Sequence, residues 1–464
     1  MQQLQKAVNL RMRSPQVARA CIGALVGCMA LAMPVWAMDL QQTYEAALKN
    51  DATIRASRAT AAAMRERLPQ ARAQRLPNVS LSVARNYNDL TTDTQNSYGQ
   101  PVSYQNQYYS SNKNLTVRQP IYRPFVQALV SQAQAQVDDA NASLERDEQS
   151  LVVRVAEAYF DALLARSQLA LVIAQKNSYT KQLDAAKKSL IAGSGTRTDV
   201  DDAQAHVDMA QAQELEARQN LEFTQRRVET LTGQPVGTLS DLDVQRFKPM
   251  QPVPADVQQW IANAENASPE LQSLRAQVEA ARLEIDKAES GHKPTLDVVA
   301  QWARTSSDSV TSVNSRYDQR FVGLQFVMPL YAGGQVSSGV RQAVAGHERA
   351  REMLEAARRD LGVRVHSEFR AVTEGVLRIA ALEQAVRSAD QAVQSNRKSF
   401  AAGSRTTLDV LNAEQQKTLA LRDLAQARYL YLVSRTRLQS LAGRDRWENI
   451  QQANEGLSVA SSAQ

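Results

Sequence analysis

The sequence contains two nearly identical stretches, "AGSGTRTDVDDA" at 192–203 and "AGSRTTLDVLNA" at 402–413, separated by an offset of 210 residues. In each, a Gly-Ser pair suits the end of one helix, and the hydroxyl residues and Asp that follow suit the start of the next. The pair therefore predicts two points at which a long helix reverses direction, one in each half of a duplicated chain.

The duplication extends well beyond the two turns. "VRVAEAYFDAL" from Val153 matches "VRVHSEFRAVT" from Val363, and "LTG" at Leu231 matches "LAG" at Leu441, all at an offset of 210. Upstream, "RLPNVSLSV" matches "HKPTLDVVA" at an offset of 217, but "QPIY" matches "MPLY" at 209. The segments that absorb this difference, 89–104 and 305–315, are predicted to be exposed loops.

The sequence patterns of the two copies predict the same order of elements: a helix, a β-hairpin and a long helical hairpin. The first repeat is 38–235, with a first helix at about 40–72, a β-hairpin at 77–121 and a helical tip near 193–199. The second repeat is 257–443, with a first helix at about 257–291, a β-hairpin at 294–330 and a helical tip near 403–409. Residues 236–256 form a linker, and 444–464 form a polar tail that we expect to be partly disordered.

The long helical patterns, about 125–190 and 339–401, contain no proline and place apolar residues at mixed spacings of three and four. This pattern predicts antiparallel, coiled-coil-like hairpins. A helix of about 65 residues would be roughly 100 Å long, far longer than a compact domain needs.

Four shorter segments, 77–86, 108–121, 294–304 and 320–330, have strand length and partial apolar alternation. They could form ordinary soluble hairpins packed on the helices, but no other element is available to cover their apolar face. Their length and terminal aromatics favour a transmembrane barrel. Because four strands cannot close a barrel, copies of the chain would have to associate, giving eight strands in a dimer or twelve in a trimer.

The first 37 residues combine four basic side chains with a short apolar run that ends in Ala37, which predicts a secretory signal peptide at 1–37. A retained membrane anchor and lipidation at Cys28, within "LVGC", are alternatives. Cleavage would lower the formal net charge from +6 to +2 and would remove both cysteines. The basic balance therefore gives no support for nucleic-acid binding.

The sequence offers no catalytic or metal-binding pattern, so we expect neither an enzyme nor a cofactor. The four histidines lack partners at ligand spacing, and no phosphate-binding loop or nucleophile elbow occurs. These histidines are His206, His292, His347 and His366.

The mature chain resembles the TolC family of trimeric outer-membrane channel proteins over 38 to about 443. The residues that carry the resemblance are "SPELQSLRAQVEAARLEIDKAESGHKPTLDV" at 268–298, "FVMPLYAGGQVSS" at 326–338 and the two turns. The resemblance implies a mainly α chain with transmembrane β-structure, in which four strands per protomer contribute to a twelve-stranded barrel in outer-membrane lipid. The barrel would continue into a periplasmic tunnel of long helices.

The resemblance also implies the function and the partners. A homotrimer would act with a periplasmic adaptor protein and an inner-membrane pump or ABC transporter, as the exit duct of a tripartite efflux pump or a type I secretion system. Drugs, small toxic compounds or polypeptides could be its cargo, and the sequence does not choose among them. A periplasmic adaptor or structural coiled-coil protein is the alternative, although a duplicated hairpin is unusual for an adaptor.

The tips carry the expected site residues. Positive φ at a helix C-cap would suit both tip glycines, and the candidates to cap the returning helices are Ser194, Thr198, Ser404 and Thr407. By resemblance, adaptor hairpins would dock at Gly193, Ser194, Gly403 and Ser404. The pore entrance would be ringed by Asp409 and by Asn412, which stands where the family usually has a second acid. A gate latch would use Arg405, Phe400, Thr198 and Asp199, with Phe400 lacking the hydroxyl usual at its position.

Overall fold

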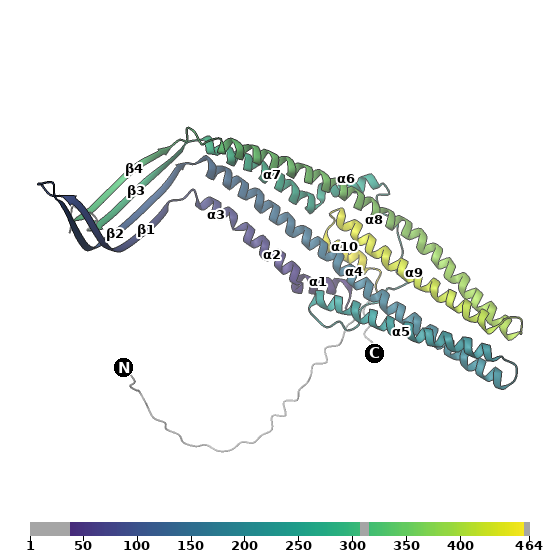
Figure 1. Ribbon diagram of the computed structural model, residues 1–464. Coiled ribbons are helices and arrows are strands. Elements are labelled where there is room, and N and C mark those ends of the chain that lie inside the picture. The colour runs from purple at the N-terminus through teal and green to yellow at the C-terminus, as the bar shows by residue number, and fades with distance from the viewer. Residues whose placement is uncertain (1–37, 307–314, 459–464) are drawn as a thin grey trace, which may run out of the picture.

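The computed structural model describes residues 38–306 and 315–458. The predicted signal peptide and the last six residues lie outside this range. The described chain is mainly helical and elongated, with a four-stranded sheet at one end and the tips of two helical hairpins at the other (Figure 1).

The same order of elements occurs in both copies. In the first copy it is α1 (Leu40–Asn50), α2 (Ala52–Arg65), α3 (Arg67–Ala73), β1 (Asn78–Gln95), β2 (Pro101–Tyr122), α4 (Pro124–Ile191) and α5 (Arg197–Thr232). In the second it is α6 (Val257–Ala267), α7 (Pro269–Glu289), the 3-10 turn η1 (Ser290–His292), β3 (Thr295–Ser306), β4 (Arg316–Val327), α8 (Gln335–Ala401) and α9 (Thr407–Leu441), after which α10 (Arg446–Asn454) ends the described fold.

The first helix of each copy is interrupted, which corrects the single helices expected at 40–72 and 257–291. Asp51 ends α1, and its carboxylate accepts hydrogen bonds from the backbone N–H groups of Thr53 and Ile54 to cap α2. In the second copy Ser268 is extended, because a residue that precedes a proline avoids helical backbone angles, and Pro269 then opens α7.

All four strands pair antiparallel in the order β1-β2-β3-β4, so the two hairpins join through β2 and β3. The loop predicted at 89–104 is wrong, because pairing of β1 with β2 continues to Gln95 and Pro101 and only 96–100 form the turn. This outer part of the hairpin is polar on both faces, so its sequence lacks the apolar alternation that identifies a strand. Of the second predicted loop, Thr305 and Ser306 belong to β3, whereas 307–314 lie outside the described residues.

The sheet has one apolar and one polar face, because residues directly opposite each other across the strands share a face. The apolar face contains Val79, Leu81, Val83, Leu115, Val117, Leu296, Val298, Ala300, Trp302, Val322, Leu324 and Phe326. The other face is mainly polar, although Val299 and Phe321 also lie on it; its polar side chains include Ser80, Ser82, Asn112, Asn114, Thr116, Gln301 and Gln319. Within the described residues, the outer edges of β1 and β4 have no neighbouring strand.

The long helices α4 and α8 contain 68 and 67 residues. Each is therefore about 100 Å long, and α4 packs along α5 as α8 packs along α9. In the described ranges, no helix is both long and apolar enough to cross a membrane.

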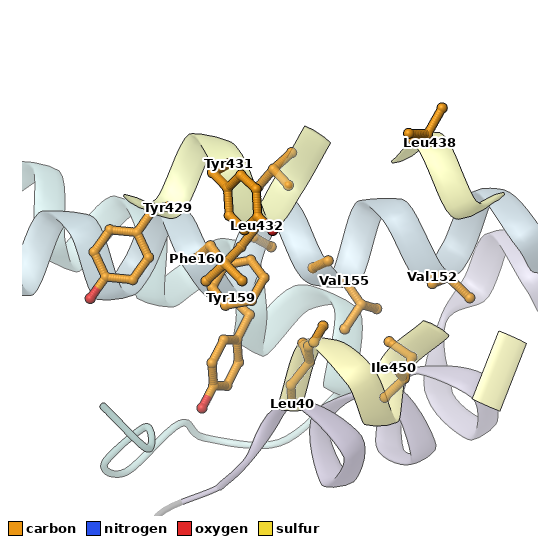
Figure 2. Packing of buried hydrophobic residues seen from close by; sticks show 14 of the residues in the cluster. Leu40, Val152, Val155, Tyr159, Phe160, Tyr429, Tyr431, Leu432, Leu438 and Ile450 are labelled. Carbon is orange, nitrogen blue, oxygen red and sulfur yellow. The ribbon is translucent and has the colours of Figure 1, made fainter. Parts of the chain in front are cut away.

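The main hydrophobic core lies midway along the helices. Tyr159 and Phe160 of α4 pack there with Tyr429 and Tyr431 of α9 (Figure 2). The hydroxyl of Tyr159 donates to the carbonyl oxygen of Ser240 at 3.0 Å and lies 3.1 Å from that of Met38, which ties the linker and the start of the described chain to α4.

Part of the tail at 444–464 forms α10, which contributes to this core, and 459–464 lie outside the described residues. Ile450 of α10 is fully buried (Figure 2), and the Asn449 amide donates to the Thr436 carbonyl oxygen at 3.0 Å. Ala453 and Leu457 are buried in the same core, and the Trp447 ring packs on Tyr44 with the ring centroids 5.2 Å apart. These few apolar side chains in a polar sequence give little periodicity for a sequence pattern to detect.

Candidate functional site at the hairpin tips

Both helical hairpins reverse through the same backbone geometry. Gly193 and Gly403 have φ of 73° and 76°, and a Cβ atom at either would meet no neighbour within 4 Å. Glycine is therefore required because the backbone is left-handed, and not because a larger side chain would clash with a neighbour. The next N–H groups, of Ser194 and Ser404, donate to carbonyl oxygens five residues back, as in a Schellman C-cap.

The returning helices begin with matching capping boxes. Thr196 caps α5 and Thr406 caps α9: each hydroxyl accepts from the N–H of the Asp three residues on, and that Asp accepts from the N–H of the Thr. The predicted caps are therefore wrong. Ser194 and Ser404 instead donate backward, to Ser189 and Ser399, and Thr198 and Thr407 lie inside the first helical turn.

Asp409 is held in its charged form at the start of α9. Its carboxylate accepts from the N–H and the hydroxyl of Thr406, each at 2.9 Å, and it lies 3.6 Å from the Arg405 guanidinium. The pKa of Asp409 is lowered, first by the backbone hydrogen bond from Thr406 and then by the Thr406 hydroxyl and Arg405. Asn412, one helical turn further on, is exposed.

The two tips of one chain face each other across a groove of about 490 Å³. Ser194 and Asp199 line it from the first hairpin, and Phe400 and Thr407 line it from the second. The structure therefore brings two of the expected latch residues, Asp199 and Phe400, to the same groove. Within the described part of a single chain, no hydrogen bond or ion pair joins Arg405 to Thr198 or Asp199.

A polar contact joins the two helical hairpins farther along the helices, at Glu414 of α9. This carboxylate is buried, with 6% of the residue exposed. It accepts from Gln182 of α4 at 3.1 Å, from Ser178 of α4 and from Arg397 of α8 at 2.6 Å. Glu414 therefore joins three helices from both hairpins through charge-assisted hydrogen bonds.

Sequence reasoning missed this cluster, although the duplication held a signal. At the offset of 210, Glu414 corresponds to Gln204 and Arg397 corresponds to Lys187. Gln204 instead donates to Asp208 of its own helix at 2.9 Å. An acid and a guanidinium specific to the second copy point to a contact that only the second hairpin makes.

The described residues contain no group of three or more His, Cys, Asp or Glu side chains that could hold a metal ion. The His206 ring packs beside Tyr179, with the ring centroids 5.1 Å apart. The polar contacts of this region are helix caps at the tips and, farther along the helices, the hydrogen bonds that Glu414 accepts from both hairpins.

The sequence matches the family model described as outer membrane efflux protein over residues 43–234 and 260–444. These two ranges fall on the two copies. The alkaline protease secretion protein AprF of Pseudomonas aeruginosa is 35% identical over 417 residues, which cover 88% of this chain and 85% of AprF. The outer membrane protein TolC of Escherichia coli is 30% identical and covers 91% of this chain and 85% of TolC.

A solved structure shows the same fold. The outer membrane protein VceC of Vibrio cholerae superimposes with a TM-score of 0.73 at 18% identity, over 87% of this chain and 96% of VceC. The resemblance inferred from the repeated motifs is thus confirmed over residues 43–234 and 260–444. The chain belongs to the outer membrane efflux protein family, as a TolC-type channel of the outer membrane and not an enzyme.

Proposed function

We propose that this channel is the outer-membrane exit duct of a type I secretion system, passing polypeptides from an inner-membrane ABC transporter to the outside. The observation that carries the proposal is the match to AprF, a protein named for alkaline protease secretion, over 88% of this chain.

Three copies would form the duct. Over the described residues, the sheet of one chain has two unpaired edges, one apolar face and one mainly polar face. These features are expected of one third of a twelve-stranded barrel with lipid outside and water inside. Helices of about 100 Å would continue this barrel as a tunnel through the periplasm.

The hairpin tips would act as the gate and as the adaptor-docking surface. Three copies of Asp409 would form an acidic ring at the entrance, while Arg405 would reach Thr198 and Asp199 of a neighbouring chain to hold the closed state. An adaptor that contacts Gly193, Ser194, Gly403 and Ser404 would separate the tips and open the duct.

Export of drugs or small toxic compounds, with a periplasmic adaptor and an inner-membrane pump, is the second candidate. The family description as an efflux protein favours it. Both functions use the same duct, so the partner transporter decides between them.

Complementation separates the two candidates. The chain is expressed in a Gram-negative strain that lacks its own TolC-type channel, with either a protease-exporting ABC transporter and its adaptor or a drug pump and its adaptor. We expect protease in the medium in the first arm, and none when the ABC transporter is omitted. Restored drug resistance without protease export would favour the second candidate, and failure of both arms would contradict the proposed duct.

A further inference from the structure

We propose that the outer part of the barrel surface binds the phosphorylated glycolipid of the outer leaflet through five basic side chains. This basic girdle consists of Arg85 in β1, Lys113 in β2, Arg304 in β3, and Arg316 and Arg320 in β4. The inference concerns the lipid partner of the barrel and does not depend on the cargo or on the gate.

The strand register places all five side chains on the apolar face of the sheet. Lys113 lies opposite Val83 on one side and opposite Arg304 on the other, and Arg320 lies opposite Trp302. Arg85 and Arg316 lie on the same face, one cross-strand row nearer the outer turn. A row is a set of residues directly opposite one another across the four strands, here Arg85, Ser111, Ser306 and Arg316.

The girdle lies between the apolar band and the outer turn. The helices join the sheet near Asn78 and Val327, whereas the turn at 96–100 is at the far end (Figure 1). One row beyond Arg85, the rings of Tyr87 and Tyr109 pack with their centroids 5.2 Å apart. Aromatic rings mark the membrane interface in such barrels, so the girdle lies at the outer edge of the apolar band, immediately on the membrane side of these rings.

The charges in these rows are poorly balanced within the chain. Lys113 and Arg304 are exposed and directly opposite each other, and like charges at such cross-strand positions are destabilising. Asp318, which lies directly opposite Arg304 on its other side, is the acid in the same rows of the described sheet. It also accepts from the Trp302 indole at 3.0 Å and lies 3.5 Å from Arg320, so one carboxylate faces five basic side chains. A bound anion would balance the remaining positive charge, that of Lys113 above all.

The surface beside the girdle suits an amphiphile better than a free ion. A shallow hollow of about 330 Å³ lies next to Arg320, lined by Leu115, Val117, Ala300, Trp302 and Val322 among others. Arginine and lysine bind phosphate oxygens through charge-assisted hydrogen bonds, while the apolar hollow can take an acyl chain. A lipid A headgroup, with phosphates directly above acyl chains, matches both features.

The test measures lipid binding to the full-length channel, purified in detergent, by native mass spectrometry. The probes are lipid A with its phosphates, the same lipid after enzymatic dephosphorylation, and inorganic phosphate alone. The test variant is Lys113→Gln/Arg304→Gln. The matched control is Arg118→Gln, because Arg118 is in the same strand but faces the polar side, opposite Asn78 and Val299.

We expect the unmodified channel to retain phosphorylated lipid A at least tenfold better than the dephosphorylated lipid, and the double variant to lose about tenfold in affinity. Lys113→Arg/Arg304→Lys, which keeps both charges, should bind as the unmodified protein does. Equal retention of both lipids, an equal loss in Arg118→Gln, or displacement by millimolar inorganic phosphate would overturn the proposal.

Discussion

Asp409 combines a structural and an electrostatic role in a single side chain. It closes the capping box with Thr406 and contacts Arg405. The hydrogen bonds that complete the cap also stabilise the carboxylate, because both are donated to its charged form. The residue that would form the entrance ring is therefore both fixed in position and kept ionised.

The first prediction concerns the pH dependence of ion selectivity. Within one chain the pKa of Asp409 is lowered, first by the Thr406 backbone N–H, whereas repulsion among the three carboxylates of the ring would raise it. In planar bilayers, cation selectivity should therefore be full at neutral pH and should decline in acid as the ring is protonated. Asp409→Asn should abolish this pH dependence, and Asn412→Asp should strengthen cation selectivity and block by multivalent cations. Selectivity that is unchanged in Asp409→Asn would contradict the assignment.

The second prediction concerns the latch. If Arg405 and Asp199 hold the tips of neighbouring chains together, Arg405→Ser or Asp199→Ala should raise the single-channel conductance several-fold. Arg197→Ser is a matched control, because Arg197 is at the other tip and pairs with Asp201 of its own helix at 3.1 Å. Unchanged conductance in both latch variants, or the same increase in the control, would refute the latch.

At the scale of the element, the turns show what a sequence pattern can and cannot predict. Positive φ at Gly193 and Gly403 was predictable, because glycine next to a helix end has few other uses. The residue that caps the returning helix was not predictable. Several hydroxyl residues follow one another in each tip, and a helix start one or two positions earlier or later would give an equally plausible cap. The observed Thr196 and Thr406 satisfy the capping box with an Asp three residues on.

The length of strand β1 was mispredicted for a different reason. The apolar alternation at Val79, Leu81 and Val83 identified the apolar part of β1, but β1 continues to Gln95 with mostly polar side chains. In this outer part, backbone pairing is joined by cross-strand hydrogen bonds from the Gln105 and Gln107 side chains to Asp89. Neither kind of contact leaves a periodic apolar signal in the sequence.

The third prediction tests the link between the hairpins. Glu414→Ala removes the hydrogen bonds from Ser178, Gln182 and Arg397. A hydrogen bond to a charged group contributes about 1.5–3 kcal/mol to stability. We expect the loss of stability to be at the lower end of this range, because the Arg397 side chain is 58% exposed to solvent. The second hairpin should then open more readily, which would appear as a higher conductance and faster amide exchange at the tip of α9.

Gln204→Ala is the matched control for Glu414→Ala. Gln204 occupies the equivalent position in the first copy and bonds only within its own helix, to Asp208. It should change neither conductance nor exchange at the second tip. If Glu414→Ala behaved like Gln204→Ala, Glu414 would not couple the hairpins.

At the scale of the whole molecule, duplication explains the architecture. Each copy supplies one β-hairpin and one helical hairpin, and the hairpins of the two copies join side by side through β2 and β3. The order of elements was readable from the repeat, because matching sequences fold alike. The contact through Glu414 and the docking of α10 could not be inferred from the repeat, because each occurs in only one of the two copies.

The final prediction concerns assembly. Both native cysteines lie in the first 37 residues, so after cleavage of the expected signal peptide a chain with one cysteine in β1 and one in β4 has no other thiol. In the part of the chain that the structure describes, β1 and β4 are the free edges of the sheet, and they must pair between chains if the barrel is to close. Leu81→Cys combined in turn with Val322→Cys and Leu324→Cys should yield, on oxidation in the outer membrane, a covalent ladder that ends at three chains. Either cysteine alone should give no ladder. A ladder that ends at two chains, or that continues past three, would contradict a twelve-stranded barrel.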